Sequence, residues 1–196
     1  MSPLARLARM VEESIRLKER FFTLHGEPVV AAAELLARVF KAGGRVLIFG
    51  NGGSAADAQH LAAEFVNRFQ IERPPLAALA LTTDTSILTA VANDYDFREV
   101  FAKQVRALGR PGDLAWGIST SGNSANVVAG LNAARELGLK TLALSGGDGG
   151  PVAAAAEVAL IVPSRDTPRI QEVQITIGHV LCDLVDYRLF PEKFGG

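Results

Sequence analysis

The sequence contains 196 residues, with 20 Lys and Arg against 21 Asp and Glu, so its formal net charge is only -1. This length suits one α/β domain that buries a core without disulfides or structural metals, and the near-neutral charge excludes the basic surface that direct nucleic-acid binding requires. The one cysteine, Cys182, excludes a disulfide or a thiolate metal site within the chain.

Two helices are predicted ahead of the first strand. Apolar residues between Pro3 and Leu24 follow the helical period, His25 and Gly26 interrupt it, and an Ala- and Leu-rich helix resumes over residues 27–42. The N-terminal stretch lacks the apolar core of a signal peptide, and no run reaches about 18 apolar residues. We therefore expect a cytoplasmic protein with no membrane association.

Five short apolar segments then predict five strands. They are Arg45 to Phe49, Leu76 to Leu81, Leu114 to Ile118, Thr141 to Leu144 and Val158 to Val162. The intervening segments have helical character and are long enough for crossovers, which predicts a five-stranded parallel sheet with helices on both faces. Such sheets bind ligands beyond the carboxyl ends of their strands.

A glycine-rich loop, Gly50 to Ser54, follows the first strand. We expect Ser54 to cap the next helix, whose free N–H groups would face the loop. The segment also matches the looser dinucleotide pattern G-x-G-x-x-A through Ala55. A nicotinamide site would need an acidic residue about 20 positions on, whereas the nearest acid at a strand end, Asp84, comes later.

A second polar loop, Ser119 to Ser124, follows the third strand and opens the helix Ala125 to Leu137. Hydroxyls and N–H groups at a helix N-terminus can hold a phosphate without Lys or Arg. Ordinary helix capping is the alternative, but the loop carries more hydroxyls than one cap uses. The later turn Ser145 to Gly150 is interpreted as a plain connection.

The final predicted helix, Arg169 to Phe190, is apolar nearly all round, which suggests burial against other subunits. It carries Gln171 and His179, eight residues apart and able to share one broad side. His60 and Glu64, four residues apart on the helix after Ser54, share a face. From spacing alone, His60 would pair with the Glu64 carboxylate on the surface, and His179 would be a hydrogen-bonded core histidine.

Four strings, G-N-G-G-S-A-A-D-A-Q-H-L-A-A-E, A-N-D-Y-D-F, G-I-S-T-S-G-N-S-A-N-V and R-I-Q-E-V-Q, closely resemble the phosphoheptose isomerases in order and spacing. The resemblance implies a SIS (sugar isomerase) domain of flavodoxin-like, three-layer architecture over residues 1–196. Residues 1–43 would be helices used in oligomerisation, and residues 44–196 would carry the sheet and the C-terminal helix. It further implies a homotetramer that converts sedoheptulose 7-phosphate to D-glycero-D-manno-heptose 7-phosphate, for heptose of cell-surface lipopolysaccharide.

The same resemblance implies roles for residues. Glu64 and His179 would transfer protons through a cis-enediol, and one Zn²⁺ per subunit would be held by His60, Glu64, Gln171 and His179. The substrate would contact Asn51, Gly52, Gly53, Ser54, Glu64, Asn93, Asp94, Ser119, Thr120, Ser121, Ser124 and Gln171. Because active sites of the family lie between subunits, His179 is expected to serve a neighbour's Glu64.

Two alternatives stay open at this stage. One is a non-enzymatic SIS-fold regulator that binds a replication-initiator protein. The segments Asn67 to Phe69 and Glu72 to Pro74 resemble those of this regulator. That regulator lacks the acid at the position of Glu64 and the histidine at that of His179. The other alternative is an isomerase of a different sugar phosphate. Gln174 stands where several relatives carry histidine.

Overall fold

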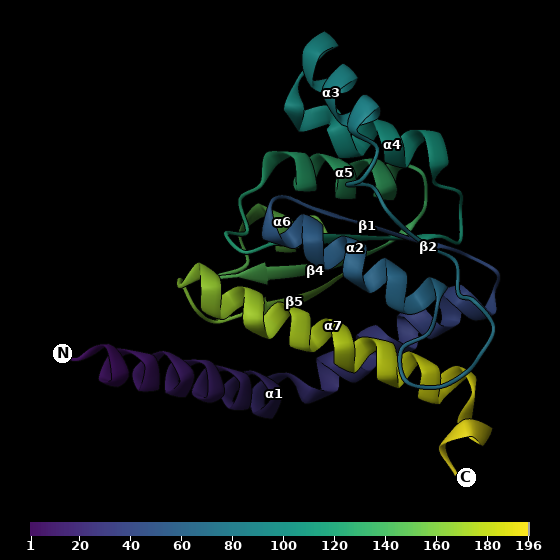
Figure 1. The fold of residues 1–196 in the computed structure, drawn as a ribbon. Coiled ribbons are helices and arrows are strands. Elements are labelled where there is room, and N and C mark those ends of the chain that lie inside the picture. Colours follow the sequence, from purple (N-terminus) through teal and green to yellow (C-terminus); the bar gives the residue numbers. More distant parts are fainter. Residues whose placement is uncertain (196) are drawn as a thin grey trace.

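The computed structural model describes residues 1–195, in which one sheet is covered by helices on both faces (Figure 1). The helices are α1 (Pro3–Lys41), α2 (Gly53–Val66), α3 (Thr85–Asp94), α4 (Val100–Leu108), α5 (Ala125–Glu136), α6 (Gly150–Ala154) and α7 (Thr167–Leu189). The strands are β1 (Val46–Gly50), β2 (Ala78–Ala80), β3 (Leu114–Ser119), β4 (Lys140–Gly146) and β5 (Val158–Val162). None of the helices over this part of the chain is long and apolar enough to span a bilayer.

All five strands pair in parallel in the order β2-β1-β3-β4-β5, which confirms the predicted sheet. β2 is shorter than expected. The main-chain N–H of Leu76 bonds the carbonyl of Phe65 at the end of α2 instead of entering the sheet.

Side chains of the central strands alternate between two apolar cores, as the pleat requires. Val46 and Ile48 pack with α1, α2 and α7, whereas Leu47 and Phe49 pack with α4, α5 and α6. The layers are visible in Figure 1, with α3 to α6 on one side of the sheet and α1 and α7 on the other. The three-layer α/β prediction is therefore confirmed.

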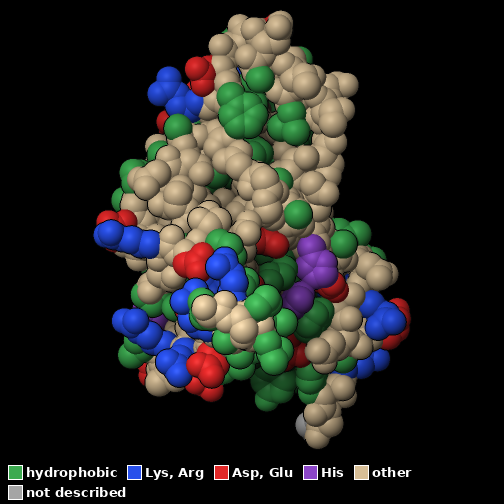
Figure 2. Space-filling model, turned by 60° about the vertical axis from the view of Figure 1, so that its left-hand side comes forward, with side chains coloured by type: hydrophobic (Ala, Val, Ile, Leu, Met, Phe, Trp, Pro, Cys, Tyr) green, Lys and Arg blue, Asp and Glu red, His purple; other side chains and the backbone are tan. Residues whose placement is uncertain are grey.

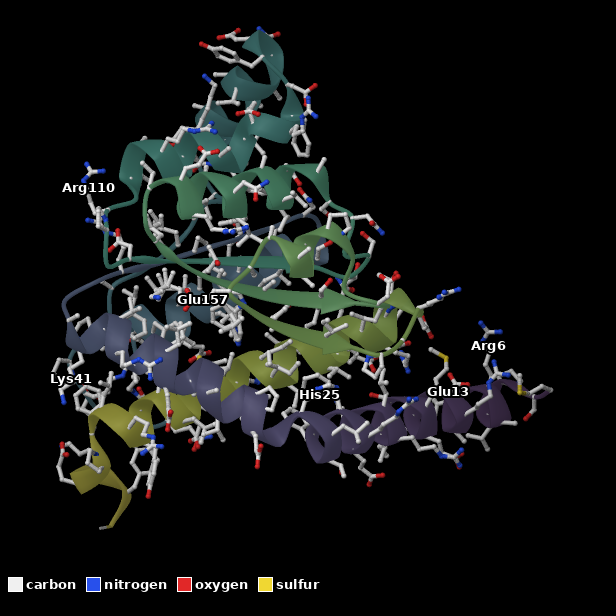
Figure 3. The ribbon with its side chains drawn as sticks, turned by 180° about the vertical axis from the view of Figure 1, so that it is seen from behind. Arg6, Glu13, His25, Lys41, Arg110 and Glu157 are labelled. Carbon is white, nitrogen blue, oxygen red and sulfur yellow. The ribbon has the colours of Figure 1, made fainter. Side chains whose placement is uncertain are left out.

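The predicted break at His25 is a kink at which two helical halves of α1 meet. His25 has φ -124° and ψ 20°, which kinks α1 but does not end it. Pro28, three residues later, has no N–H to donate and its ring crowds the carbonyl of Leu24, which accounts for the bend. Figure 3 labels His25 between Glu13 and Lys41 on the two halves of this helix.

The two halves of α1 differ in burial. Beyond the kink, Val29, Leu36 and their neighbours are buried against the sheet and α7. Before it, the helix extends past the sheet, and Leu4 and Leu7 are 76% and 59% exposed. The exposed apolar surface of this chain is therefore concentrated on the first half of α1.

One side of the last helix is covered within the chain. Residues Ile170, Ile177 and Leu181 of α7 are buried within the same chain, against the sheet and α1. The excess apolar surface of α7 therefore needs no other subunit to cover it on this side. Periodicity could not reveal this, because the covering helix, α1, is more than a hundred residues away in the sequence.

Candidate active site

The glycine-rich loop joins β1 to α2 at the carboxyl edge of the sheet. Gly52 has φ +55°, a conformation that favours glycine, and it precedes the first residue of α2 without a side-chain cap. Ser54 is buried in the first turn of the helix, so the prediction that Ser54 is the cap is wrong.

Gln171 of α7 packs directly on this loop. A Cβ atom on Gly53 would collide with Nε2 of Gln171, so a larger residue there would require the amide to move. The start of α2 and the start of α7 are thereby brought together, which places Gln171 at the same end of α2 as the loop.

Three side chains of ligand type meet between α2 and α7. Nε2 of His60 lies 2.8 Å from Nε2 of His179 and 3.3 Å from Oε1 of Glu64. One ligand atom from each residue lies within 4.8 Å of the others. Figure 2 shows histidine side chains gathered on one face beside acidic ones. The predicted meeting of His60, Glu64 and His179 is present, but within one chain, so His179 does not depend on a neighbour to reach a carboxylate.

The surroundings of His179 favour its neutral form. Burial lowers its pKa below 6.5, the nearby His60 lowers it further, and Glu64 acts in the opposite direction. The ring of Phe69 stacks on His179 with centroids 5.5 Å apart and shields one face from water. A neutral imidazole can either accept a proton or bind a metal ion.

The donor set fits a metal ion. Two imidazole nitrogens and a carboxylate oxygen, all within reach of one point, are ligands typical of catalytic zinc. Two imidazole Nε2 atoms at 2.8 Å share either one proton or one cation. The geometry of His60 and His179 is therefore compatible with a metal site as well as with a hydrogen bond.

The serine loop after β3 forms a hydroxyl cluster. Oγ of Ser119 lies 2.9 Å from Oγ of Ser124 and 3.5 Å from Oγ of Ser121. Ser124 precedes α5 but makes no side-chain capping bond. Its hydroxyl is therefore directed into the loop, and ordinary capping does not explain these serines.

A cavity of about 330 Å³ opens beside this cluster. Its walls include Thr120, Ser121 and Arg165. The turn after β4, interpreted from sequence as a plain connection, contributes Gly147 and Asp148 to the same cavity. A phosphate-sized anion in this cavity would therefore meet several hydroxyls and the cation of Arg165, with the carboxylate of Asp148 also in the wall.

Comparison with known proteins decides the family. A family model described as the SIS domain matches residues 10–146. The chain is 59% identical over 184 residues to the phosphoheptose isomerase of Solidesulfovibrio magneticus, covering 94% of this chain and 90% of the relative. It is 55% identical over 183 residues to that of Aquifex aeolicus, covering 93% and 96%. The chain belongs to the phosphoheptose isomerase family.

Solved structures of the family agree. The structure of the phosphoheptose isomerase of Neisseria gonorrhoeae superposes with a TM-score of 0.89 at 50% identity, covering 94% of this chain and 99% of that one. That of Francisella tularensis gives 0.91 at 39% identity, covering 95% and 99%. Membership places the chain among sugar-phosphate isomerase enzymes and does not favour the non-enzymatic regulator.

Two residues predicted to contact the substrate, Asn93 and Asp94, lie away from the other predicted site residues. Asn93 and Asp94 end α3, where the Asn93 amide donates to the Asp94 carboxylate at 2.8 Å. Figure 1 shows α3 on the side of the sheet opposite α7. Within the described residues of one chain, the phosphoheptose isomerase fold does not bring Asn93 and Asp94 to His179.

Sequence reasoning missed two residues of this site. Asn126 exchanges amide hydrogen bonds of 2.8 and 2.7 Å with Asn51, which holds the Asn51 side chain at the loop. Arg165 adds a cation to a cavity that was expected to have none. The available signal was position, because Arg165 comes just after β5 and therefore at the same edge as Ser119.

Proposed function

We propose that this protein converts sedoheptulose 7-phosphate to D-glycero-D-manno-heptose 7-phosphate, in the pathway that supplies heptose for lipopolysaccharide. The observation that carries the proposal is the meeting of Glu64 and His179, from α2 and α7, two helices that both begin at the sheet edge where the serine cluster lies. Relatives with this name cover almost the whole chain and support the substrate assignment.

Isomerisation moves one proton between two carbons and another between their oxygens, through a cis-enediol. Glu64 takes a proton from C1 of the ketose and returns it to C2, while His179 transfers the O1 proton to O2. Burial supports the role of His179, since a lowered pKa favours the neutral imidazole, which can accept a proton before it donates one.

A zinc ion would be held by His60, Glu64 and His179. The family resemblance implies Gln171 as the fourth ligand, although its amide lies against Gly53 at the start of α2 in one chain. When bound, it would polarise the carbonyl and stabilise negative charge on the enediol oxygens. A bound ion would compete with the transferred protons for the lone pairs of Glu64 and His179.

Substrate binding is divided between the two loops. Ser119, Thr120, Ser121 and Ser124 would hold the phosphate with the N-terminus of α5. The sugar hydroxyls would contact Asn51, Gly52, Gly53, Ser54 and Gln171. The amide pair between Asn51 and Asn126 supports this, because it orients one amide in advance of binding.

Assembly into a homotetramer would complete the site. Exposed apolar residues on the first half of α1, including Leu4, Leu7 and Ile15, support a role for residues 1–43 in association. Asn93 and Asp94 lie apart from His179 in one chain, so we assign them to the site of a neighbouring subunit. We further propose that the 1–196 chain acts as one SIS domain in the cytoplasm, without nucleic-acid or membrane partners.

Incubation of purified protein with sedoheptulose 7-phosphate, followed by NMR detection of the aldose, tests the function. We expect conversion by the wild type and a loss of about 100-fold or more in Glu64→Gln, with a surface control, Glu136→Gln, unaffected. Conversion of only other sugar phosphates would reassign the substrate. No turnover together with capture of a replication-initiator protein would favour the regulator.

A further inference from the structure

A buried ion pair lies beneath the histidine cluster, at residues that the proposed function does not use. Nε of Arg73 lies 2.9 Å from Oδ1 of Asp186, with both side chains almost inaccessible, 0% and 2% exposed. Arg73 belongs to the connection between α2 and β2, and Asp186 to α7. The pair therefore ties the connection that follows α2, the helix of Glu64, to α7, the helix of His179.

The guanidinium also caps the end of α2. Nη2 of Arg73 donates to the carbonyl of Glu64 at 2.9 Å, and Nη1 donates to the carbonyl of Phe65 at 2.6 Å. The last carbonyls of a helix have no intrahelical donor, and a cation is favourable at this end of the helix dipole. Arg73 therefore fixes the backbone of Glu64 itself.

On α7, Asp186 comes seven residues after His179, which is about two turns along the same side of the helix. Contacts between α2 and α7 are thus fixed at two levels, at His60 with His179 and at Arg73 with Asp186. A shift of the Arg73–Asp186 contact would therefore change the distance between Glu64 and His179.

We propose that Arg73, clasped by Asp186, is a positioning residue that holds Glu64 and His179 at the separation needed for proton transfer. The proposal rests on the isomerase function proposed above. A buried ion pair adds little net stability, because desolvation offsets the attraction. The planar guanidinium of Arg73 does fix the relative position of α2 and α7, because it donates to both helices at once. A lysine could not donate in those directions.

Three variants test the proposal. Arg73→Lys keeps the charge but removes the fork, and Asp186→Asn keeps one acceptor oxygen. Asp113→Asn is the matched control, because Asp113 is also buried, at 4% exposed, but accepts from the main-chain N–H groups of Arg45 and Arg110 and, within the described residues, contacts neither α2 nor α7 through a hydrogen bond. The folded fraction of each variant is measured by circular dichroism at the assay temperature.

For Arg73→Lys we expect kcat per folded molecule to fall about 10- to 100-fold while KM for sedoheptulose 7-phosphate stays within about twofold. Asp186→Asn should lose less, because the carbonyl bonds remain, and Asp113→Asn should keep wild-type kcat even if its Tm falls. Amide hydrogen exchange should accelerate in the last turn of α2 in Arg73→Lys but not in α5.

Wild-type kcat per folded molecule in Arg73→Lys, or a rise in KM without a fall in kcat, would overturn the proposal. Hydrogen exchange separates this failure from that of the proposed function. If the wild type converts no sugar phosphate, the isomerase function fails. Faster exchange at the end of α2 would then still support Arg73 as the residue that holds this helix, and unchanged exchange would refute it.

Discussion

Nε2 of His60 lies 2.8 Å from Nε2 of His179, although 119 residues separate them in the sequence. Two imidazoles at this distance cannot both carry a proton on the facing nitrogens without strong repulsion. They are held together by one shared proton or by one metal ion, and Glu64 lies close enough to join either arrangement.

Zinc binding should therefore raise thermal stability. At a free Zn²⁺ concentration 100 times its Kd, stabilisation is about 2.7 kcal/mol, which corresponds to a Tm increase of about 5 to 10 °C for a chain of this size. Thermal melts with Zn²⁺ and with a chelator measure it. The double variant His60→Ala, His179→Ala should show no such shift, and an equal shift in that variant would place the metal elsewhere.

Mixing experiments test which residues come from the same subunit. Glu64 and His179 lie in one chain, so co-assembled Glu64→Gln and His179→Ala subunits should recover no activity through exchange of these two residues. By contrast, Glu64→Gln mixed with Asp94→Asn should regain part of the wild-type activity, because a neighbour supplies Asp94. Recovery in the first mixture would contradict the single-chain geometry, and none in the second would remove Asp94 from the neighbouring site.

Arg165 should strengthen phosphate binding through an exposed, screened charge. We expect Arg165→Gln to raise KM about fivefold at low ionic strength, which corresponds to about 1 kcal/mol, with kcat unchanged. The difference should shrink at about 1 M salt. Arg110→Gln, at the other end of the sheet, serves as a control. A salt-independent increase in KM would mean that Arg165 acts through structure instead of charge.

The carboxyl group of Asp57 should make the folding stability depend on pH. Burial raises its pKa from 3.8 to about 6, partly offset by His60, and its Oδ2 is buried without a hydrogen-bond partner in the described residues. A raised pKa means that the folded protein binds this proton more tightly, so stability is lost as the pH rises from about 4 to about 6.

Replacement of Asp57 by Asn removes this cost at high pH only. In the presence of chelator, Asp57→Asn should melt above the wild type at about pH 8 and close to it at about pH 4. Thermal melts at both pH values measure the difference. The same Tm change at both would show that the carboxylate does not titrate as its burial indicates.

Local patterns in the sequence were sufficient for the strands, the glycine loop and the serine loop. Apolar runs separated by helical segments predict a parallel sheet, because the period and the crossover length are local properties. The carboxyl ends of β1 and β3 then had to lie side by side at one edge, and the polar residues there had to be neighbours. The placement of His60 and Glu64 on one helix face followed from their spacing alone.

Contacts between distant segments needed the tertiary structure. The cover that α1 provides for α7, the proximity of His60 to His179, and the pairing of Arg73 with Asp186 each join residues more than a hundred positions apart. No periodicity encodes such contacts, because they depend on how helices cross over a finished sheet. Packing also decided that Gly52, not Ser54, precedes α2, since the serine side chain is buried in the turn that the loop forms.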